Sequence, residues 1–390
     1  MIHIGSPKVA YEDNSAILYT DVIIDGKSDT IWFKVDKKYG EYLCFERSDA
    51  YVIAMLNYAM RNSHDIECDV PISEDIYYNI DRYLIDALVK HNKDFYRPII
   101  RAKVASEPLP CANAVGTGIS CGVDSLHALA NQTNLIFKKH NITHLTFNNV
   151  GSHGEGKRAS ELFAKRCERP MRFAKEYGFD IIVSDSNLMD IIKQVHFESH
   201  TYSSLFPVYC LQKLYSIYYY ASAGFGYHEF RLNERDCGAY ELLSLPLFST
   251  NRLRIYSEGE GLSRMDKLKE IVRYKPSYKY LNVCLSSENN CGKCEKCIRT
   301  LLGIDALGEL DRYKEVFDID YYRKHKKWYI QQLVIQESLG KHDYIELATY
   351  FKDEITFVMH CRALPYKILG WFPILRGSNI HKTIKKWIKK

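Results

Sequence analysis

The segment 120–125, with the sequence Ser-Cys-Gly-Val-Asp-Ser, constrains the fold of this 390-residue chain more than any other feature. Before it, residues 111–119 form a small, apolar run that predicts a buried strand, and after it residues 126–130 begin a helix. A tight turn from a strand to a helix leaves the first N–H groups of the helix pointing at one spot, where the helix dipole is positive. The sequence therefore predicts an α/β unit with an anion site at this turn.

The side chains of this turn also suit an anion site. Ser120 and Ser125 offer hydroxyl groups, and Gly122 lets a ligand approach the backbone because it has no Cβ atom. Asp124 can position Mg²⁺ or cap the helix. An ordinary helix N-cap is the alternative interpretation, because Ser and Asp are also the preferred residues there.

A cluster of four cysteines stands later in the chain, at Cys284, Cys291, Cys294 and Cys297. Two residues separate Cys291 from Cys294, and two more separate Cys294 from Cys297, so these three thiolates can surround one point. Cys284 supplies a fourth thiolate from the other side of a short loop. Tetrahedral zinc needs such a set of ligands. Iron–sulfur sites also use closely spaced cysteines, but the bacterial ferredoxin pattern ends in Cys-Pro, which this chain lacks. The spacing predicts Zn²⁺.

The turn at 120–125 resembles the PP-loop of the N-type ATP pyrophosphatases, whose usual form is Ser-Gly-Gly-x-Asp-Ser, with Val123 at the variable position. The order of this loop followed by the cysteine cluster makes residues 112–307 similar to 7-cyano-7-deazaguanine synthase. The resemblance implies an enzyme that uses ATP and Mg²⁺, adenylates a carboxylate or related oxygen with release of pyrophosphate, and lets a nitrogen nucleophile displace AMP. It gives catalytic roles to Ser120, Asp124 and Ser125.

One residue of the loop departs from the pattern, because Cys121 stands where the family has glycine. If this position needs a positive φ, a cysteine costs about 1 kcal/mol of strain. Cys121 is either a tolerated small residue or a reactive thiolate, since a helix N-terminus lowers the pKa of a thiol.

Further ATP contacts follow from the resemblance. It places adenine contacts near the end of the second strand, on Phe147, Asn148 and Asn149, although Asn also commonly caps turns. Arg264 and Lys267 lie in a segment similar to the one that leads to a late basic residue of the family. They are candidates for phosphate contact, and a solvated helix face is the alternative.

Between the loop at 120–125 and the cysteine cluster, segments typical of strands alternate with segments typical of helices. We expect strands at 142–150, 180–185 and 228–232, and helices at 158–177 and 207–223. This alternation predicts an α/β fold with a doubly wound, mostly parallel sheet, which the resemblance makes adenine nucleotide alpha hydrolase-like. Ligands bind such sheets beyond the carboxyl ends of the strands.

Three domains are expected. Residues 1–105 predict an N-terminal α+β module, with a hairpin around Asp25-Gly26 and helices at 49–60 and 73–91. Residues 106–310 form the PP-loop domain with its zinc knuckle, and 311–390 a C-terminal helical extension with a basic tail. The N-terminal module is expected either to recognise a substrate or partner or to stabilise a homodimer.

The composition limits which partners and which cellular location we expect. The net charge of +5 is too small to imply binding to nucleic acid by itself. Twelve cysteines in a chain without a signal peptide or an apolar run of membrane-spanning length predict a cytoplasmic protein. The basic, amphipathic segment 371–390 predicts a helix that lies on RNA, on a membrane surface or on the protein itself.

Three functions remain after these arguments. The first is the adenylating enzyme described above, acting on a small-molecule substrate or on a partner macromolecule that it modifies. The second is an RNA-modifying PP-loop enzyme of the tRNA-thiolating type, and the third is a non-catalytic, zinc-stabilised nucleotide-binding module in which Cys121 has abolished catalysis.

Overall fold

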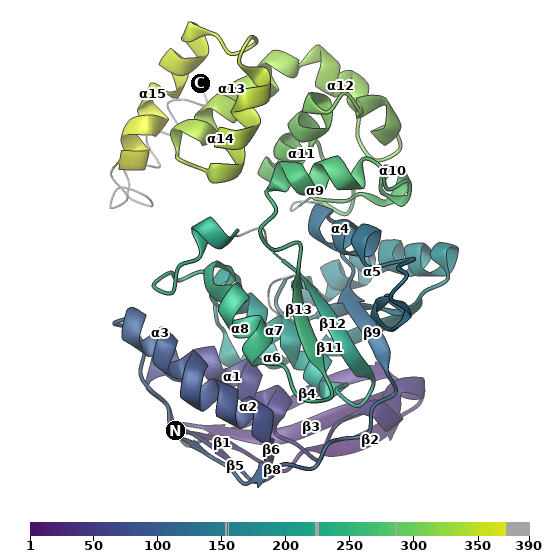
Figure 1. Cartoon of the computed structure of the whole chain (residues 1–390), viewed down its shortest axis with the longest axis vertical. Helices are drawn as coiled ribbons and strands as arrows, with labels where there is room; N and C mark the ends of the chain where they lie inside the picture. Colours follow the sequence, from purple (N-terminus) through teal and green to yellow (C-terminus); the bar gives the residue numbers. More distant parts are fainter. Residues whose placement is uncertain (153, 155, 223–225, 285–286, 372–390) are drawn as a thin grey trace. The chain divides into compact units, whose positions relative to one another are not determined.

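A computed structural model of the chain describes residues 1–152, 154, 156–222, 226–284 and 287–371 (Figure 1). The chain divides into two compact units. The first comprises residues 1–120 and 124–261, and the second comprises 121–123 and the residues from 262 onward. Over the described ranges, no helix is both long enough and apolar enough to cross a membrane.

The first unit is built on a mixed sheet of eleven strands, whose order is β13-β12-β9-β10-β11-β4-β3-β1-β5-β7, with β2 paired to β3. Five neighbouring strands are parallel: β9 (Ala114–Gly118), β10 (His144–Asn149), β11 (Asp180–Ser186), β12 (Tyr215–Ala221) and β13 (Arg254–Glu258). The chain leaves β9 toward β10 and β11 on one side, and later continues with β12 and β13 on the other. The strand order therefore reverses between β9 and β12, as in Rossmann-like sheets.

The N-terminal strands extend this sheet. They are β1 (Ile2–Ile4), β2 (Lys8–Glu12), β3 (Ser15–Ile24), β4 (Lys27–Asp36), β5 (Ile66–Cys68) and β7 (Ile100–Arg101), while β6 (Ile72–Ser73) and β8 (Val104–Ala105) pair separately. The predicted hairpin around Asp25-Gly26 is confirmed. Both turn residues have positive φ, 51° and 81°, which matches the twist of a two-residue hairpin.

The expected separation of residues 1–105 from the domain at 106–310 is not found. Strand β4 pairs antiparallel with β11, placing Lys34 opposite Asp185 and Phe33 opposite Ser186. The sheet edge at β11 is thus covered by N-terminal residues, because an unpaired edge leaves N–H and C=O groups unsatisfied. The predicted boundary at 310 also differs from the structure, in which the second unit already includes residue 262.

Helices cover both faces of the parallel strands (Figure 1). Phe163 stacks on Phe147 of β10 with 5.2 Å between ring centroids, whereas Thr146 hydrogen-bonds Tyr218 of β12. Because side chains alternate along a strand, Phe147 and Thr146 point to opposite faces. The helices of this unit are α1 (Asp49–Asn62), α2 (Glu74–Asn79), α3 (Ile85–His91), α4 (Val123–Asn131), α5 (Gly156–Tyr177), α6 (Leu188–Ile192), α7 (His196–Cys210) and α8 (Glu241–Leu247).

Two predicted elements are wrong. The helix expected at 207–223 ends at Cys210, and Tyr215–Ala221 is instead the central strand β12. Its Tyr-rich sequence is buried on both faces, so it lacks the alternation that marks a half-exposed strand. The strand expected at 228–232 is also absent from the described residues, where the Arg231 N–H bonds locally to the Ala239 carbonyl.

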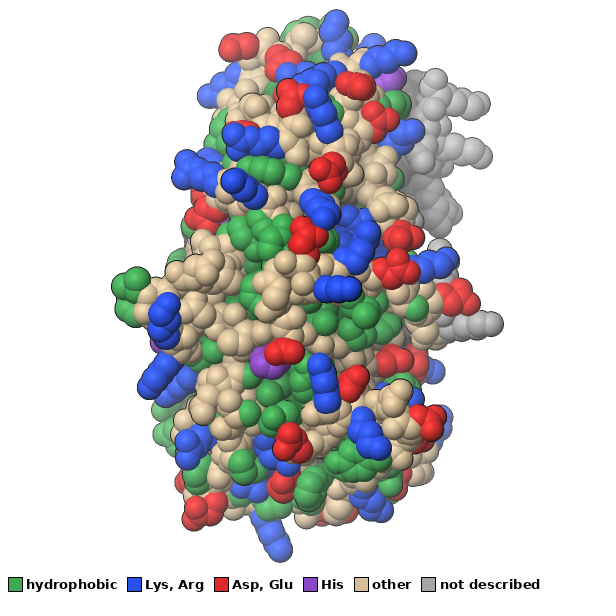
Figure 2. All heavy atoms as spheres, turned by 90° about the vertical axis from the view of Figure 1, so that its right-hand side faces the viewer, with side chains coloured by type: hydrophobic (Ala, Val, Ile, Leu, Met, Phe, Trp, Pro, Cys, Tyr) green, Lys and Arg blue, Asp and Glu red, His purple; other side chains and the backbone are tan. Residues whose placement is uncertain are grey.

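The second unit consists of helices and loops. Its helices are α9 (Arg264–Ile271), α10 (Pro276–Tyr280), α11 (Glu295–Ala306), α12 (Ile319–Lys324), α13 (Lys326–Ser338), α14 (His342–Ala348) and α15 (Phe357–Trp371). The expected basic tail at 371–390 lies outside the described residues, except for the last residue of α15. Lys, Arg, Asp and Glu side chains are interspersed over the face drawn in Figure 2.

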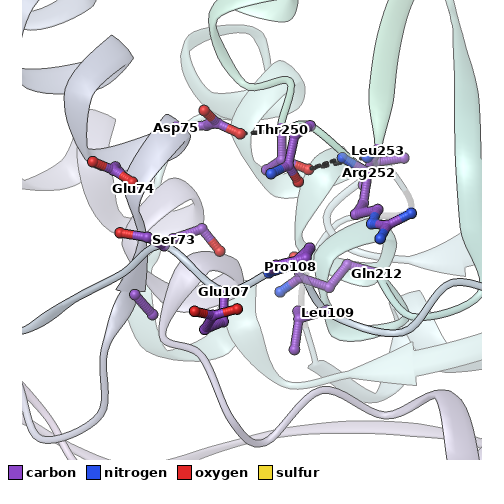
Figure 3. A pocket seen from close by; sticks show the side chains of 13 residues that line it. Ser73, Glu74, Asp75, Glu107, Pro108, Leu109, Gln212, Thr250, Arg252 and Leu253 are labelled. Carbon is purple, nitrogen blue, oxygen red and sulfur yellow. Dashed lines mark hydrogen bonds between the residues drawn. The ribbon is translucent and has the colours of Figure 1, made fainter.

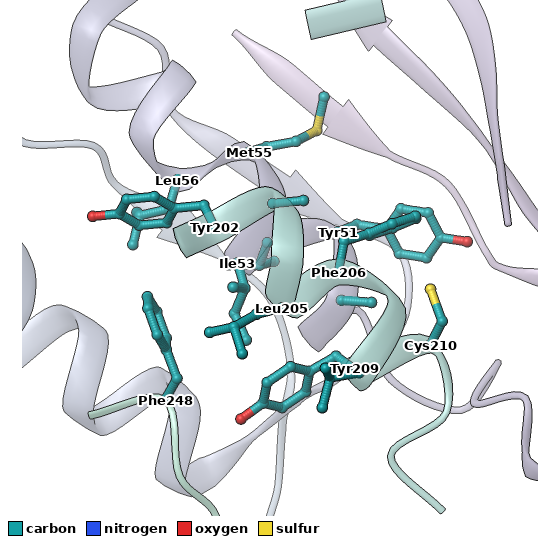
Figure 4. Close-up of a cluster of buried hydrophobic side chains, with 14 of the residues drawn as sticks. Tyr51, Ile53, Met55, Leu56, Tyr202, Leu205, Phe206, Tyr209, Cys210 and Phe248 are labelled. Carbon is teal, nitrogen blue, oxygen red and sulfur yellow. The ribbon is translucent and has the colours of Figure 1, made fainter. Parts of the chain in front are cut away.

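The core of the first unit lies where α7 packs against α1 (Figure 4). Phe206 of α7 is fully buried and meets Tyr51 of α1 and Phe33 of β4 edge to face, with ring centroids 5.5 and 6.1 Å away. Helix α7 therefore joins N-terminal residues to the parallel strands through a single hydrophobic core.

Replacing Phe206 with alanine is expected to lower the free energy of unfolding by about 3–5 kcal/mol, because it leaves a cavity in this core. Phe197→Ala is the matched control, since Phe197 lies on the same helix with 43% of its surface exposed. Urea unfolding would measure both changes at an unchanged m-value. Equal losses in the two variants would contradict the central position of Phe206.

Candidate functional site

A cavity of about 310 Å³ opens at the carboxyl ends of β9, β10 and β12, next to the point where the strand order reverses. Its walls come from the last residue of β9 and residues 119–120 after it, the first turn of α4, residues 146–148 of β10, helix α7 and the end of β12. A volume of this size falls at the lower end of small-molecule sites. The topology therefore puts a cavity where doubly wound sheets bind ligands.

Three of the predicted loop residues line this cavity: Ser120, Asp124 and Ser125. The hydroxyl oxygens of Ser120 and Ser125 are 3.4 Å apart, so both face the same point. Helix α4 begins at Val123, so Asp124 and Ser125 on the cavity wall belong to its first turn. The arrangement suits an anionic group.

Cys121 has φ of +58° and is buried. The turn therefore requires the left-handed conformation that the expected glycine would adopt without strain. Within the second unit, the Asn282 N–H donates to the Cys121 carbonyl at 2.8 Å. Burial favours the interpretation of Cys121 as a small packed residue, since reactive cysteines are partly exposed.

The three residues predicted at the end of β10 have different surroundings. Phe147 and Asn148 line the cavity. Ser184 donates to Asn148 Oδ1 at 2.7 Å, and Asn148 Nδ2 donates to Thr146 Oγ1 at 3.3 Å, so the amide is held in one orientation. Asn149 instead donates to Asp185 Oδ1 at 2.8 Å and stands outside the set that lines the cavity.

Arg264 and Lys267 both lie on α9 in the second unit, at its first and fourth residues. Ser263 caps this helix by accepting from the Asp266 N–H at 3.1 Å. Lys267 is 1% exposed, so a freely solvated position is excluded for it. Phosphate contact by either residue stays a prediction.

Sequence reasoning missed the part of the cavity formed by α7 and β12. His196, Ser204, Tyr218 and Tyr220 line it. Burial raises the pKa of Tyr218 to about 12, so its hydroxyl stays protonated and bonds to Thr146 Oγ1 at 2.8 Å. Reading 215–221 as a strand rather than a helix would have placed these tyrosines at the site.

The four cysteines predicted as metal ligands come together in the second unit. The sulfur atoms of Cys284, Cys291, Cys294 and Cys297 all lie within 4.8 Å of one another, and those of Cys284 and Cys294 are 4.0 Å apart. Tetrahedral zinc with bonds of about 2.3 Å brings its sulfur ligands to a similar separation. The cluster can therefore hold a zinc ion.

The backbone around the cluster also fits a thiolate site. Cys291 Sγ accepts from the Lys293 and Cys294 N–H groups, at 3.4 and 3.3 Å. This knuckle turns at Gly292, whose φ is +69° and whose carbonyl accepts from the Tyr329 hydroxyl at 2.8 Å. Hydrogen bonds of this kind, to a ligand atom and to the backbone that carries it, orient the ligands before a metal binds.

A second pocket, shown in Figure 3, lies between residues 73–75, 105–109 and 250–253. Its volume is about 40 Å³, which admits a few water molecules but no nucleotide. Asp75 accepts from the Asn251 N–H at 2.6 Å, and Thr250 accepts from the Leu253 N–H at 3.0 Å. These bonds hold the loop 250–253 at the edge of this pocket.

Comparisons with known proteins add no family to this description. No family model matches the chain, and no curated protein or solved structure is similar to it. We therefore infer a function from the cavity, the cysteine cluster and the sequence motifs.

The cysteine cluster predicts one zinc ion per chain. Replacing Cys294 with serine is expected to abolish stoichiometric zinc and to destabilise the second unit, because a thiolate ligand is lost. Metal analysis of the purified protein measures the ratio. Cys361→Ser is the control, since Cys361 is exposed on α15 and should leave zinc unchanged. Retention of a full equivalent by the Cys294 variant would exclude this residue as a ligand.

The left-handed conformation of Cys121 gives a second prediction. Cys121→Ala keeps the Cβ atom at positive φ, whereas Cys121→Gly removes it, and both delete the sulfur. The glycine variant is therefore expected to be more stable than the alanine variant by about 1 kcal/mol. Chemical unfolding of the two proteins measures the difference, and a more stable alanine variant would show that the residue is not strained.

Proposed function

We propose that the chain is an ATP-dependent enzyme that adenylates a carboxylate or related oxygen, releases pyrophosphate, and allows a nitrogen nucleophile to displace AMP. One observation carries this proposal: a cavity at the reversal of the strand order has the helix α4 N-terminus and the hydroxyls of Ser120 and Ser125 at one end. This combination suits the phosphates of a nucleotide. We also propose that the α/β fold is of the adenine nucleotide alpha hydrolase-like type.

The polar end of the cavity suits the pyrophosphate part of ATP. When the acceptor oxygen attacks the α-phosphorus, the bond to the bridging oxygen breaks and negative charge develops on pyrophosphate. The N–H groups of α4 and the hydroxyls of Ser120 and Ser125 would stabilise this charge. The Asp124 carboxylate, which also lines the cavity, is of the type that holds Mg²⁺.

The wall formed by β10 suits the adenosine part. Phe147 and Asn148 line the cavity at the end of β10. The Asn148 amide is already oriented by Ser184 and Thr146, so its placement requires no ordering when a base binds. We place the adenine at this end of β10 and the acceptor toward α7 and β12.

The second chemical step is acyl transfer to nitrogen. The carbon–oxygen bond to AMP breaks as the carbon–nitrogen bond forms, and the nucleophile gives up a proton. Adenylation makes this possible because AMP is a far better leaving group than oxide. In this proposal the zinc ion is structural, since all four of its ligands come from cysteines and no position is left for a substrate.

Asp124→Asn and Ser125→Ala test the proposed phosphate end. Each variant is expected to lose roughly 100-fold in AMP formation, as when one transition-state contact is removed. The assay uses Mg-ATP, ammonium and the carboxylic acid that corresponds to 7-cyano-7-deazaguanine, and it also follows the affinity for Mg-ATP. Asp94→Asn, at an exposed position, is the control. Undiminished turnover in both loop variants would contradict the assignment.

A further inference from the structure

A chain of three hydrogen-bonding side chains leads from the cavity wall, through a largely buried histidine, to a partly exposed carboxylate. Tyr220 of β12 lines the cavity, and its hydroxyl oxygen is 2.9 Å from His200 Nδ1. On the other side of the imidazole ring, His200 Nε2 is 3.2 Å from Asp236 Oδ1. All three residues belong to the first unit, and they come from three separate elements of it.

While His200 is neutral, the chemistry of these groups fixes the direction of both hydrogen bonds. Burial alone would raise the pKa of Asp236, but hydrogen bonds from His200 and from the Gly238 N–H outweigh it and hold this pKa below its ordinary value. The Asp236 carboxylate is therefore an acceptor only, so Nε2 carries the hydrogen. In the neutral imidazole Nδ1 is then an acceptor, and the Tyr220 hydroxyl donates to it.

We propose that Tyr220, His200 and Asp236 form a relay that removes the proton from the nitrogen nucleophile. This inference rests on the proposed function and concerns its second step. As the carbon–nitrogen bond forms, an N–H bond of the nucleophile breaks and its proton moves to the Tyr220 oxygen. The Tyr220 O–H proton moves to His200 Nδ1, and Asp236 stabilises the imidazolium that results.

To accept a proton from the nucleophile, Tyr220 needs a neighbouring base that takes up its own hydroxyl proton. Burial raises the pKa of Tyr220, so its hydroxyl is not ionised near neutral pH and is a poor base alone. Transfer of its own proton to His200 in the same step avoids a free phenolate. Tyr220 is thus the catalytic residue, and His200 and Asp236 are positioning residues that act through it.

The surroundings of His200 set the pH range of the relay. They include Tyr220 on β12, Asp236 and Cys237 on the loop after it, and His196, whose ring centroid is 5.6 Å away. Burial alone would lower the pKa of His200, but Tyr220, Cys237 and Asp236 raise it well above its ordinary value of 6.5. The relay needs neutral His200, so activity should fall as the pH drops through a pKa above 6.5.

Measuring the two chemical steps separately tests the relay. In a single turnover with Mg-ATP, ammonium and the same carboxylic acid, Tyr220→Phe and His200→Gln should release pyrophosphate at the wild-type rate. The later transfer to nitrogen should slow roughly 100-fold, and its acid limb should disappear. Tyr219→Phe is the control, because the Tyr219 hydroxyl bonds to the His140 carbonyl, and this residue is not among those that line the cavity.

Each kinetic outcome has a distinct meaning. A wild-type protein that releases no pyrophosphate overturns the proposed function and the relay with it. A wild-type protein that completes both steps, with Tyr220→Phe equally fast in both, overturns the relay alone. Slowing of both steps together would show that Tyr220 has a merely structural role.

The hydrogen-bond directions are testable without turnover. ¹⁵N-histidine NMR of the full chain, with His200→Gln to assign the signal, should show the Nε2–H tautomer of His200 above its pKa. An Nδ1–H tautomer would refute the relay. His200, Asp236 and Cys237 also have ligand atoms close enough to hold a metal ion. A second zinc equivalent that His200→Gln removes would likewise refute it, because Nε2 would then be a ligand.

Discussion

The close approach of two tyrosine rings to one glycine holds the centre of the sheet together. A Cβ atom at Gly116 of β9 would lie 2.7 Å from Tyr215 and 2.8 Å from Tyr218, so the rings occupy the space that a side chain would fill. A register shift between Tyr215 and Ile217 in β12 turns both rings to the same face of the sheet. This packing aligns β9 with β12 at the reversal of the strand order, and the position of the cavity depends on it.

The same arrangement explains why the cavity has two chemically different sides. Strand β9 leads into α4, whose N-terminus and serines supply donors for an anion. Strand β12 brings Tyr218 and Tyr220, whose hydroxyls are held by Thr146 and His200. One side is therefore suited to an anionic group, and the other presents tyrosine hydroxyls that are held by hydrogen bonds.

The second unit contains a cysteine cluster that can bind a metal ion. Its cysteine cluster starts helix α11, since Cys294 is the residue before its first turn and Cys297 is buried within it. Zinc binding by such knuckles contributes about 10–16 kcal/mol in isolated peptides, comparable to the whole stability of a small domain. Metal binding and folding of this unit should therefore be coupled, whereas the first unit has an extensive hydrophobic core.

The sequence by itself determined the local features. It predicted a strand at 111–119 followed by a turn and a helix from 126, where the structure has a strand at 114–118 and a helix at 123–131. It also predicted the hairpin at Asp25-Gly26 and the grouping of the four cysteines, because turn chemistry and ligand spacing act over a few residues. It also placed Ser120, Asp124, Ser125, Phe147 and Asn148 at what proved to be one cavity. The tertiary structure alone decided that 215–221 is a strand. A segment that is buried on both faces shows no alternation of apolar and polar residues, so its sequence does not distinguish a strand from a buried helix. Long-range pairing likewise decided that β4 completes the sheet and that His200 stands between Tyr220 and Asp236, contacts that join residues far apart in the chain.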